Sequence, residues 1–122
     1  MIFYLLNGSI IERLKYRRCF RSLKVQNLFY RARLKGYVLL FQVGGFIELY
    51  GPDAALAGKH FGCRVRPGFR GMDAVAGFPK AMAGKVINRL IALGCNTAFI
   101  AQGDDGRHVK NRYVRELYRV EA

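Results

Sequence analysis

The segment 39–50 constrains the fold of this chain more than any other part of the sequence. It holds two apolar stretches, each short enough to form a buried strand, separated by Gly44-Gly45. Glycine tolerates the positive φ of a tight turn, so the segment is predicted to fold as a β-hairpin. Strand side chains alternate between the two faces of a sheet. Phe46 and Glu48 are therefore predicted to share one face, and the aliphatic residues between them to face the core.

The charge of the chain narrows the class of partner. Its 122 residues suit a single domain, and a hydrophobic fraction of 52% predicts a folded core. Twenty-one Lys and Arg against eight Asp and Glu give a formal net charge of +13. Such an excess repels itself in a compact protein and is typical of a polyanion binder. Nucleic acid is the preferred partner, ahead of an anionic membrane or an acidic protein.

Cysteine usage and hydropathy indicate an intracellular, cytoplasmic protein without a membrane partner. Cys19, Cys63 and Cys95 are odd in number and scattered, which favours reduced thiols over a disulfide framework. The apolar run at Met1–Leu6 is short and lacks the basic start of a signal peptide. The longest apolar run is broken by Gln42 and Glu48 and is well below the length of a membrane span.

The remaining pattern predicts alternating helices and strands. Ser9 is a candidate N-cap for a basic helical region, formed by one long helix or two shorter ones. The clearest helix has an apolar stripe of Met82, Val86, Leu90 and Leu93 and is closed by Gly94. The expected elements are helix within 10–35, strands at 37–42 and 46–50, a helix at 54–61, a strand at 74–78, a helix starting at Pro79, a strand at 96–102, a turn at 103–106 and a last element at 112–120, which fits a strand or a helical stripe.

Basic side chains occur in three groups that are candidates for phosphate contacts. A Gly- and Pro-rich loop or hairpin carries one group, one side of the clearest helix carries the second, and the N-terminal region carries the third. Guanidinium and ammonium groups bind phosphate, although each group could also be an ordinary solvated surface. In that order the candidates are Arg64, Arg66 and Arg70; Lys80, Lys85 and Arg89; and Arg17, Arg18 and Arg21.

The sequence offers no pattern for an enzyme, a metal site or a cofactor. Gly77–Lys85 has the wrong spacing for a phosphate-binding loop and lacks its Ser or Thr. Asp104-Asp105 with His108 is predicted to be a turn, and His60 is isolated on a short helix. We therefore expect a non-enzymatic protein without cofactor.

Three blocks of this sequence resemble the N-terminal mismatch-recognition domain of the MutS DNA mismatch-repair family. The first, 39–54, is similar to the family's apolar strand, Gly turn, Phe-x-Glu and acidic helix start. The second, 76–102, has the Ala-Gly-x-Pro entry, a Leu-rich helix and the strand after it. The third and weakest is 112–117. The resemblance covers about 29–117.

The resemblance implies an α/β (α+β) fold, a mixed β-sheet with surrounding helices over 29–122, after a basic N-terminal helical extension over 1–28. By the same resemblance Phe46 would be a wedge that stacks on a mispaired or unpaired base, and Glu48 would hydrogen-bond the displaced base. Two positions depart from the family: Gly45 stands where an acid is usual and Ile47 where an aromatic is usual.

The resemblance also bears on partners. Because nothing follows residue 122, the chain is not expected to be a repair ATPase by itself. Stand-alone domains of this kind resemble accessory proteins encoded beside reverse transcriptases in retroelements, including diversity-generating ones. The expected ligand is then DNA, RNA or an RNA–DNA hybrid, and the expected protein partner a reverse transcriptase. The alternative is a structural adaptor that binds mainly a partner protein and structured RNA, with the wedge unused.

Overall fold

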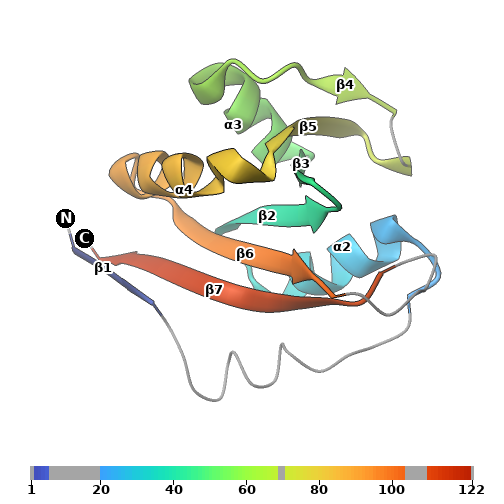
Figure 1. Cartoon of the computed structure of the whole chain (residues 1–122), viewed down its shortest axis with the longest axis horizontal. Helices are drawn as coiled ribbons and strands as arrows, with labels where there is room; N and C mark the ends of the chain where they lie inside the picture. Colours follow the sequence, from blue (N-terminus) through green and yellow to red (C-terminus); the bar gives the residue numbers. More distant parts are fainter. Residues whose placement is uncertain (1, 6–19, 69–70, 104–109, 122) are drawn as a thin grey trace.

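The computed structural model describes residues 2–5, 20–68, 71–103 and 110–121, and these form a mixed α/β structure around one sheet. The sheet has seven strands in the order β1-β7-β6-β2-β3-β5-β4 (Figure 1). The strands are β1 (Ile2–Leu5), β2 (Tyr37–Val43), β3 (Phe46–Tyr50), β4 (Arg66–Pro67), β5 (Ala74–Pro79), β6 (Asn96–Gln102) and β7 (Arg112–Glu121). Among the strands of the described residues, the β2–β6 pair is parallel and the other five pairs are antiparallel. The predicted mixed sheet with surrounding helices is confirmed.

Helices pack on both faces of this sheet. α3 (Pro52–Phe61) and α4 (Ala83–Ala92) cover one face, where Ile47 and Leu49 belong to the core. α2 (Leu23–Arg33) covers the other face, and its Tyr30 packs in a second apolar cluster. The central strands β2, β3 and β6 therefore bury side chains in both directions, as their near-continuous apolar sequences require.

Local signals in the sequence explain most helix ends. The Ser22 hydroxyl accepts a hydrogen bond from the Val25 amide at 3.2 Å and caps α2. Pro52 occupies the first turn of α3, whose end is marked by Gly62 in the left-handed conformation at φ 67°. Gly94 follows α4 at φ 82°, as predicted.

Two expectations about the segment 79–93 need correction. Pro79 ends β5 instead of starting a helix, and a 3₁₀ turn, η2 (Lys80–Met82), leads into α4. Val86 and Leu90 are buried, but Met82 and Leu93 at the ends of the predicted stripe are exposed, because they are the residues just before and just after α4.

The N-terminal segment 1–28, predicted as a helical extension, contains a strand. β1 pairs antiparallel with β7, with Ile2 opposite Glu121, so this segment extends the sheet. α2 begins before and ends after the predicted boundary at residue 28. The expected cap at Ser9, Cys19, and the turn at Asp104-Asp105 lie outside the described residues. The last predicted element, 112–120, is a strand and not a helix.

Candidate nucleic-acid interface

Phe46 lies at the tip of the predicted hairpin. β2 and β3 pair with Val43 opposite Phe46, which leaves Gly44-Gly45 as the connecting turn. Gly44 has φ 62°, the positive value for which glycine is suited. The Phe46 side chain is 57% exposed, a large fraction for a phenylalanine in a strand. The hairpin therefore presents an aromatic ring to solvent.

Glu48 lies on the same face of β3 as Phe46, as the alternation predicts, but it is only 5% exposed. The Tyr50 hydroxyl donates a hydrogen bond to Glu48 Oε1 at 2.7 Å. Tyr50 is itself buried on this face. The Glu48 carboxylate is thus held by Tyr50, the next residue on the same face of β3. The Phe46 ring is exposed, whereas Glu48 beside it is buried.

A hollow of about 360 Å³ opens beside this pair, lined by Phe46, Glu48, Arg64, Arg66 and Gly77. Gly77 of β5 is directly opposite Glu48 in the register of β3 and β5. A Cβ atom at Gly77 would lie 3.1 Å from the Ile47 carbonyl oxygen and 3.8 Å from Glu48 Cγ. The missing side chain therefore keeps space open next to the carboxylate, and two exposed arginines supply positive charge at the rim.

The side chains of two glutamines form hydrogen bonds with the hairpin turn. Gln102 Oε1 accepts a hydrogen bond from the Gly44 amide at 2.8 Å, and Gln42 Nε2 donates to the Gly44 carbonyl at 3.1 Å. The Gln102 backbone amide donates to Gln42 Oε1 at 2.9 Å, which ties the Gln42 side chain to the backbone of β6. Both backbone polar groups of Gly44 are therefore satisfied by side chains from β2 and β6.

Arg112 connects this amide pair to α2. The guanidinium donates to the Gln42 carbonyl at 2.8 Å, to Gln26 Oε1 at 2.7 Å and to Gln102 Oε1 at 3.3 Å. It also lies over the Phe41 ring, 4.9 Å from the centroid. Arg112 is only 4% exposed, so the network is a buried one that reaches from α2 to the turn beneath Phe46.

Tyr30 completes the connection, since its hydroxyl donates to the Arg112 carbonyl at 2.6 Å. Burial raises the pKa of Tyr30 to about 12, and the Arg112 guanidinium acts in the opposite direction. The phenol stays protonated and remains a donor at neutral pH.

The predicted phosphate-binding residues are spread over both faces. The Lys80 amide donates to the Gly45 carbonyl at 2.9 Å, so Lys80 begins next to the hairpin turn. Lys85 and Arg89 are exposed on α4, which covers the opposite face of the sheet from α2. Arg21 is exposed just before α2. The structure brings Arg64 and Arg66 to the hollow and leaves the α4 pair away from it.

Arg17, Arg18 and Arg70 lie outside the described residues. Within the described ranges, no three His, Cys, Asp or Glu side chains gather as a metal site would require. None of the helices in the described part of the chain has the length and apolar composition that crossing a bilayer would take. Cys63 and Cys95 are free thiols, and burial raises the pKa of each; the nearby Asp53 raises that of Cys95 further.

Sequence reasoning missed several residues of this site. Gln42 and Gln102 are polar residues in otherwise apolar strands, a signal that could have identified them. Tyr50 follows Phe46 and Glu48 in the same alternation, and Gly77 lies within the Ala-Gly-Phe-Pro block. Arg112 gave no local signal, because its partners on α2 and β2 lie 86 and 70 residues away.

Comparison with known proteins identifies the family. The family model described as MutS domain I matches residues 25–121, from α2 to the end of β7. The chain belongs to the MutS domain I family. Among curated proteins, the DNA mismatch repair protein MutS of Cytophaga hutchinsonii is 33% identical over an alignment of 93 residues, and the match covers 71% of this chain. The chain spans only 11% of the length of that relative. This MutS domain I match contains the hairpin, the hollow and the buried network, and β1 lies before it.

Proposed function

We propose that this chain is a non-enzymatic nucleic-acid-binding module that examines duplexes for mispaired or unpaired positions. The exposed Phe46 ring at the tip of a buttressed hairpin, in a chain of net charge +13, carries the proposal. Membership of the MutS domain I family and the similarity to a DNA mismatch repair protein support duplex DNA as the ligand.

Phe46 acts in this proposal as a wedge between base pairs. Inserting an apolar side chain unstacks a base step at a cost of about a few kcal/mol, and the cost is least where pairing is already faulty. Stacking of a base on an aromatic ring contributes about 1–3 kcal/mol, which offsets much of it. Because β3 already orders the backbone at Phe46, binding costs little further conformational entropy at this residue.

Glu48 acts as the second contact, for the base displaced by Phe46. Its carboxylate lies within the hollow beside the ring, so a base reaches it only by entering that space. The purine N7 only accepts hydrogen bonds, so a hydrogen bond from Glu48 to N7 requires a protonated carboxyl group. The exocyclic amino groups of cytosine and adenine donate and would pair with the carboxylate directly.

Arginine and lysine supply the sequence-independent part of the affinity. Arg64 and Arg66 are exposed at the rim of the hollow and are proposed to contact the phosphates that flank the wedge. Lys80, next to the hairpin turn, is proposed to do the same. Arg17, Arg18, Arg21, Arg70, Lys85 and Arg89 are proposed as further backbone contacts.

The test is binding of the purified protein to matched DNA, mismatched or bulged DNA, structured RNA and an RNA–DNA hybrid, each at two salt concentrations. We expect affinity for all duplexes to fall with salt, because phosphate contacts release counterions. Phe46→Ala should weaken binding to the irregular duplex about 10-fold, the value of one base–aromatic stack, and leave matched-duplex binding and its salt dependence unchanged.

Leu93→Ala is the matched control, since it removes another exposed apolar side chain, at the residue that follows the last turn of α4. It should leave both affinities as in the wild type. A folded Phe46→Ala protein that keeps its preference for irregular duplexes would refute the wedge. Absence of salt-sensitive binding to every nucleic acid would refute the proposal as a whole.

A second candidate function is a structural adaptor, and exposed apolar residues on α2 favour it. Leu28 is 55% exposed and Val25 is 39% exposed on the same helix, beside basic side chains. In this function the chain is an accessory subunit of a larger complex, such as a retroelement reverse transcriptase, and braces structured RNA with the wedge unused. Binding of nucleic acid only in the presence of that partner would favour the adaptor over the module.

A further inference from the structure

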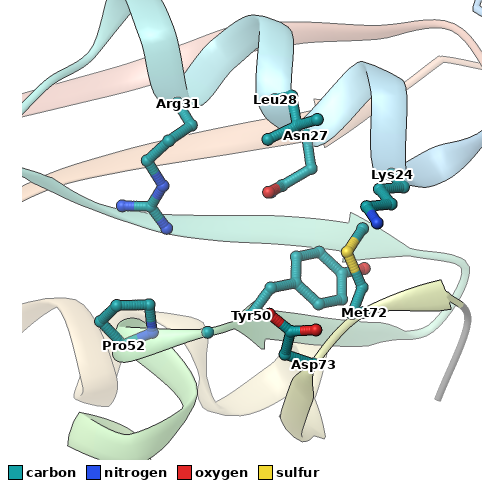
Figure 2. Close-up of a pocket in the computed structure, with 9 residues that line it drawn as sticks. Lys24, Asn27, Leu28, Arg31, Tyr50, Pro52, Met72 and Asp73 are labelled. Carbon is teal, nitrogen blue, oxygen red and sulfur yellow. The ribbon is translucent and has the colours of Figure 1, made fainter. Parts of the chain in front are cut away.

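A second, smaller pocket opens on the α2 side of the sheet, at the end of β3 away from Phe46. It has a volume of about 180 Å³. Figure 2 shows side chains of α2 pointing across it toward the opposite wall. The α2 wall consists of Lys24, Asn27, Leu28 and Arg31, and the opposite wall of Tyr50, Gly51, Pro52, Met72 and Asp73.

The first observation that points to a ligand is the Asn27 side chain. Asn27 is only 6% exposed, and among the described residues its Nδ2 is buried without a hydrogen-bond partner. A buried amide donor left unpaired costs about 1–3 kcal/mol. The Asn27 side chain also lines the pocket, so a rotation of its amide group about χ2 would bring Nδ2 to an acceptor atom of a ligand bound there.

The second observation is the chemistry of the two walls. Lys24 places a donor on the α2 wall, and Asn27 adds an amide group, which carries both a donor and an acceptor. The exposed Asp73 carboxylate faces this wall as an acceptor from the residue before β5 (Figure 2). Arg31 is also on the donor side, with one nitrogen held 2.6 Å from Asp53 Oδ2. A ligand for this pocket must therefore accept hydrogen bonds on one edge and donate them on another. Phosphate groups and peptide carboxylates only accept, so both would leave Asp73 opposed by like charge.

A nucleobase meets these conditions. Its edge carries donors and acceptors side by side, and lysine, asparagine and aspartate are residues that pair with such edges. Tyr50, Met72 and Leu28 provide apolar surface for its flat faces. The volume is below the range of about 300–1,000 Å³ typical of pockets for whole small ligands. The pocket therefore suits one group of a larger molecule.

The position of the pocket agrees with this ligand. Tyr50 lies on the same face of β3 as Phe46, four residues along, which at about 3.3 Å per residue is about 13 Å. Two pockets thus lie in a row on one face of the strand, with the Tyr50–Glu48 hydrogen bond between them. We propose that the α2 pocket binds a single unpaired nucleobase a few nucleotides from the position examined by Phe46. This inference rests on the proposed nucleic-acid binding and adds a second base site to it.

The test uses NMR on the whole chain with a probe that does not need a duplex. Deoxyguanosine monophosphate is titrated against the ¹⁵N-labelled protein, with ribose 5-phosphate as the control that lacks a base. We expect saturable shifts of the Asn27 side-chain amide with the nucleotide and none with the sugar phosphate. Equal shifts with both probes would show a phosphate site, and no shift at Asn27 would show that the pocket takes no base; either result overturns the inference.

Binding to duplexes provides the second readout. A duplex with one unpaired nucleotide is compared with the same duplex carrying an abasic bulge. Asn27→Leu and Asp73→Leu should each lower the preference for the base-containing bulge over the abasic bulge at least fivefold. Matched-duplex binding should be unchanged in Asn27→Leu, whereas Asp73→Leu removes a negative charge and should strengthen binding to every duplex alike. Asn88→Leu, the same change as Asn27→Leu at an exposed position of α4, should have no effect.

The two proposals fail in different ways. If no duplex is bound at any salt concentration, the proposed function fails. If duplexes are bound with salt dependence but Asn27→Leu keeps the full preference for the base-containing bulge, only the base pocket fails.

Discussion

Replacing Arg112 by methionine tests whether the buried network holds the structure beneath the hairpin. Arg112 is 4% exposed and donates to Gln26 Oε1 at 2.7 Å, to the Gln42 carbonyl at 2.8 Å, to the Lys110 carbonyl at 3.2 Å and to Gln102 Oε1 at 3.3 Å. Methionine keeps an unbranched stem of similar length but donates no hydrogen bond. Four acceptors then lose a donor inside the protein.

The magnitude follows from these contacts. Hydrogen bonds to a charged group contribute about 1.5–3 kcal/mol each, and the two short ones alone would amount to about 3–6 kcal/mol. Removal of the buried charge also removes its desolvation cost, which offsets part of the loss. We therefore expect a net loss of about 3 kcal/mol. Domains are stable by about 5–15 kcal/mol, so this is a large fraction, and it corresponds to a drop in Tm of about 10 °C.

The assay is equilibrium unfolding in urea, followed by far-UV circular dichroism. Arg115→Met is the matched control, because Arg115 is exposed on the same strand. It should change the free energy of unfolding by no more than about 0.5 kcal/mol. If Arg112→Met and Arg115→Met are equally stable, the network contributes nothing to the fold and the reasoning is wrong.

Three further results are expected. Burial raises the pKa of Tyr30 to about 12, so the stability that comes from keeping this phenol protonated is fully present below about pH 10 and is lost as the pH rises toward 12. Between these pH values, urea unfolding should show that the free energy of unfolding falls by about 2 kcal/mol more in the wild type than in Tyr30→Phe. Gly77→Ala should lower the free energy of unfolding by about 1 kcal/mol, because its Cβ would lie 3.1 Å from the Ile47 carbonyl, and an unchanged Tm would show that the strands adjust freely. Burial raises the pKa of the Cys63 and Cys95 thiols, so maleimide should label both more slowly at pH 7 than it labels an unstructured cysteine peptide, and a mass spectrometry time course that finds equal rates would contradict this.

The elements that the sequence predicts correctly are those set by local patterns. The hairpin at 39–50 follows from two apolar stretches and a glycine turn, and the separation of Phe46 and Glu48 from Ile47 follows from alternation alone. The end of α3 at Gly62 follows in the same way from a residue that favours the left-handed conformation. None of these requires knowledge of a partner far along the chain.

Features that depend on distant partners could not be predicted. Ile2–Leu5 is too short to identify as a strand, and its partner strand ends at Glu121, at the other end of the sequence. Pro79 has the local signature of a helix start, yet it extends β5 because Phe46 of β3 lies opposite. The burial of Glu48 could not be predicted for the same reason, since it depends on the strands that lie beside β3.

The recessed position of Glu48 changes what the Phe-x-Glu pair can do. The sequence alone suggests two side chains offered together to a duplex, but the structure exposes one ring and holds the carboxylate on Tyr50. In the proposed function, a regular duplex at the hairpin would meet Phe46 and the rim arginines, and its stacked bases would stay outside the hollow. A base that has lost its partner would enter the hollow, and only such a base would reach Glu48. Discrimination would therefore arise from which bases can leave the stack, with the carboxylate adding affinity after that step and contributing nothing to binding of matched duplex.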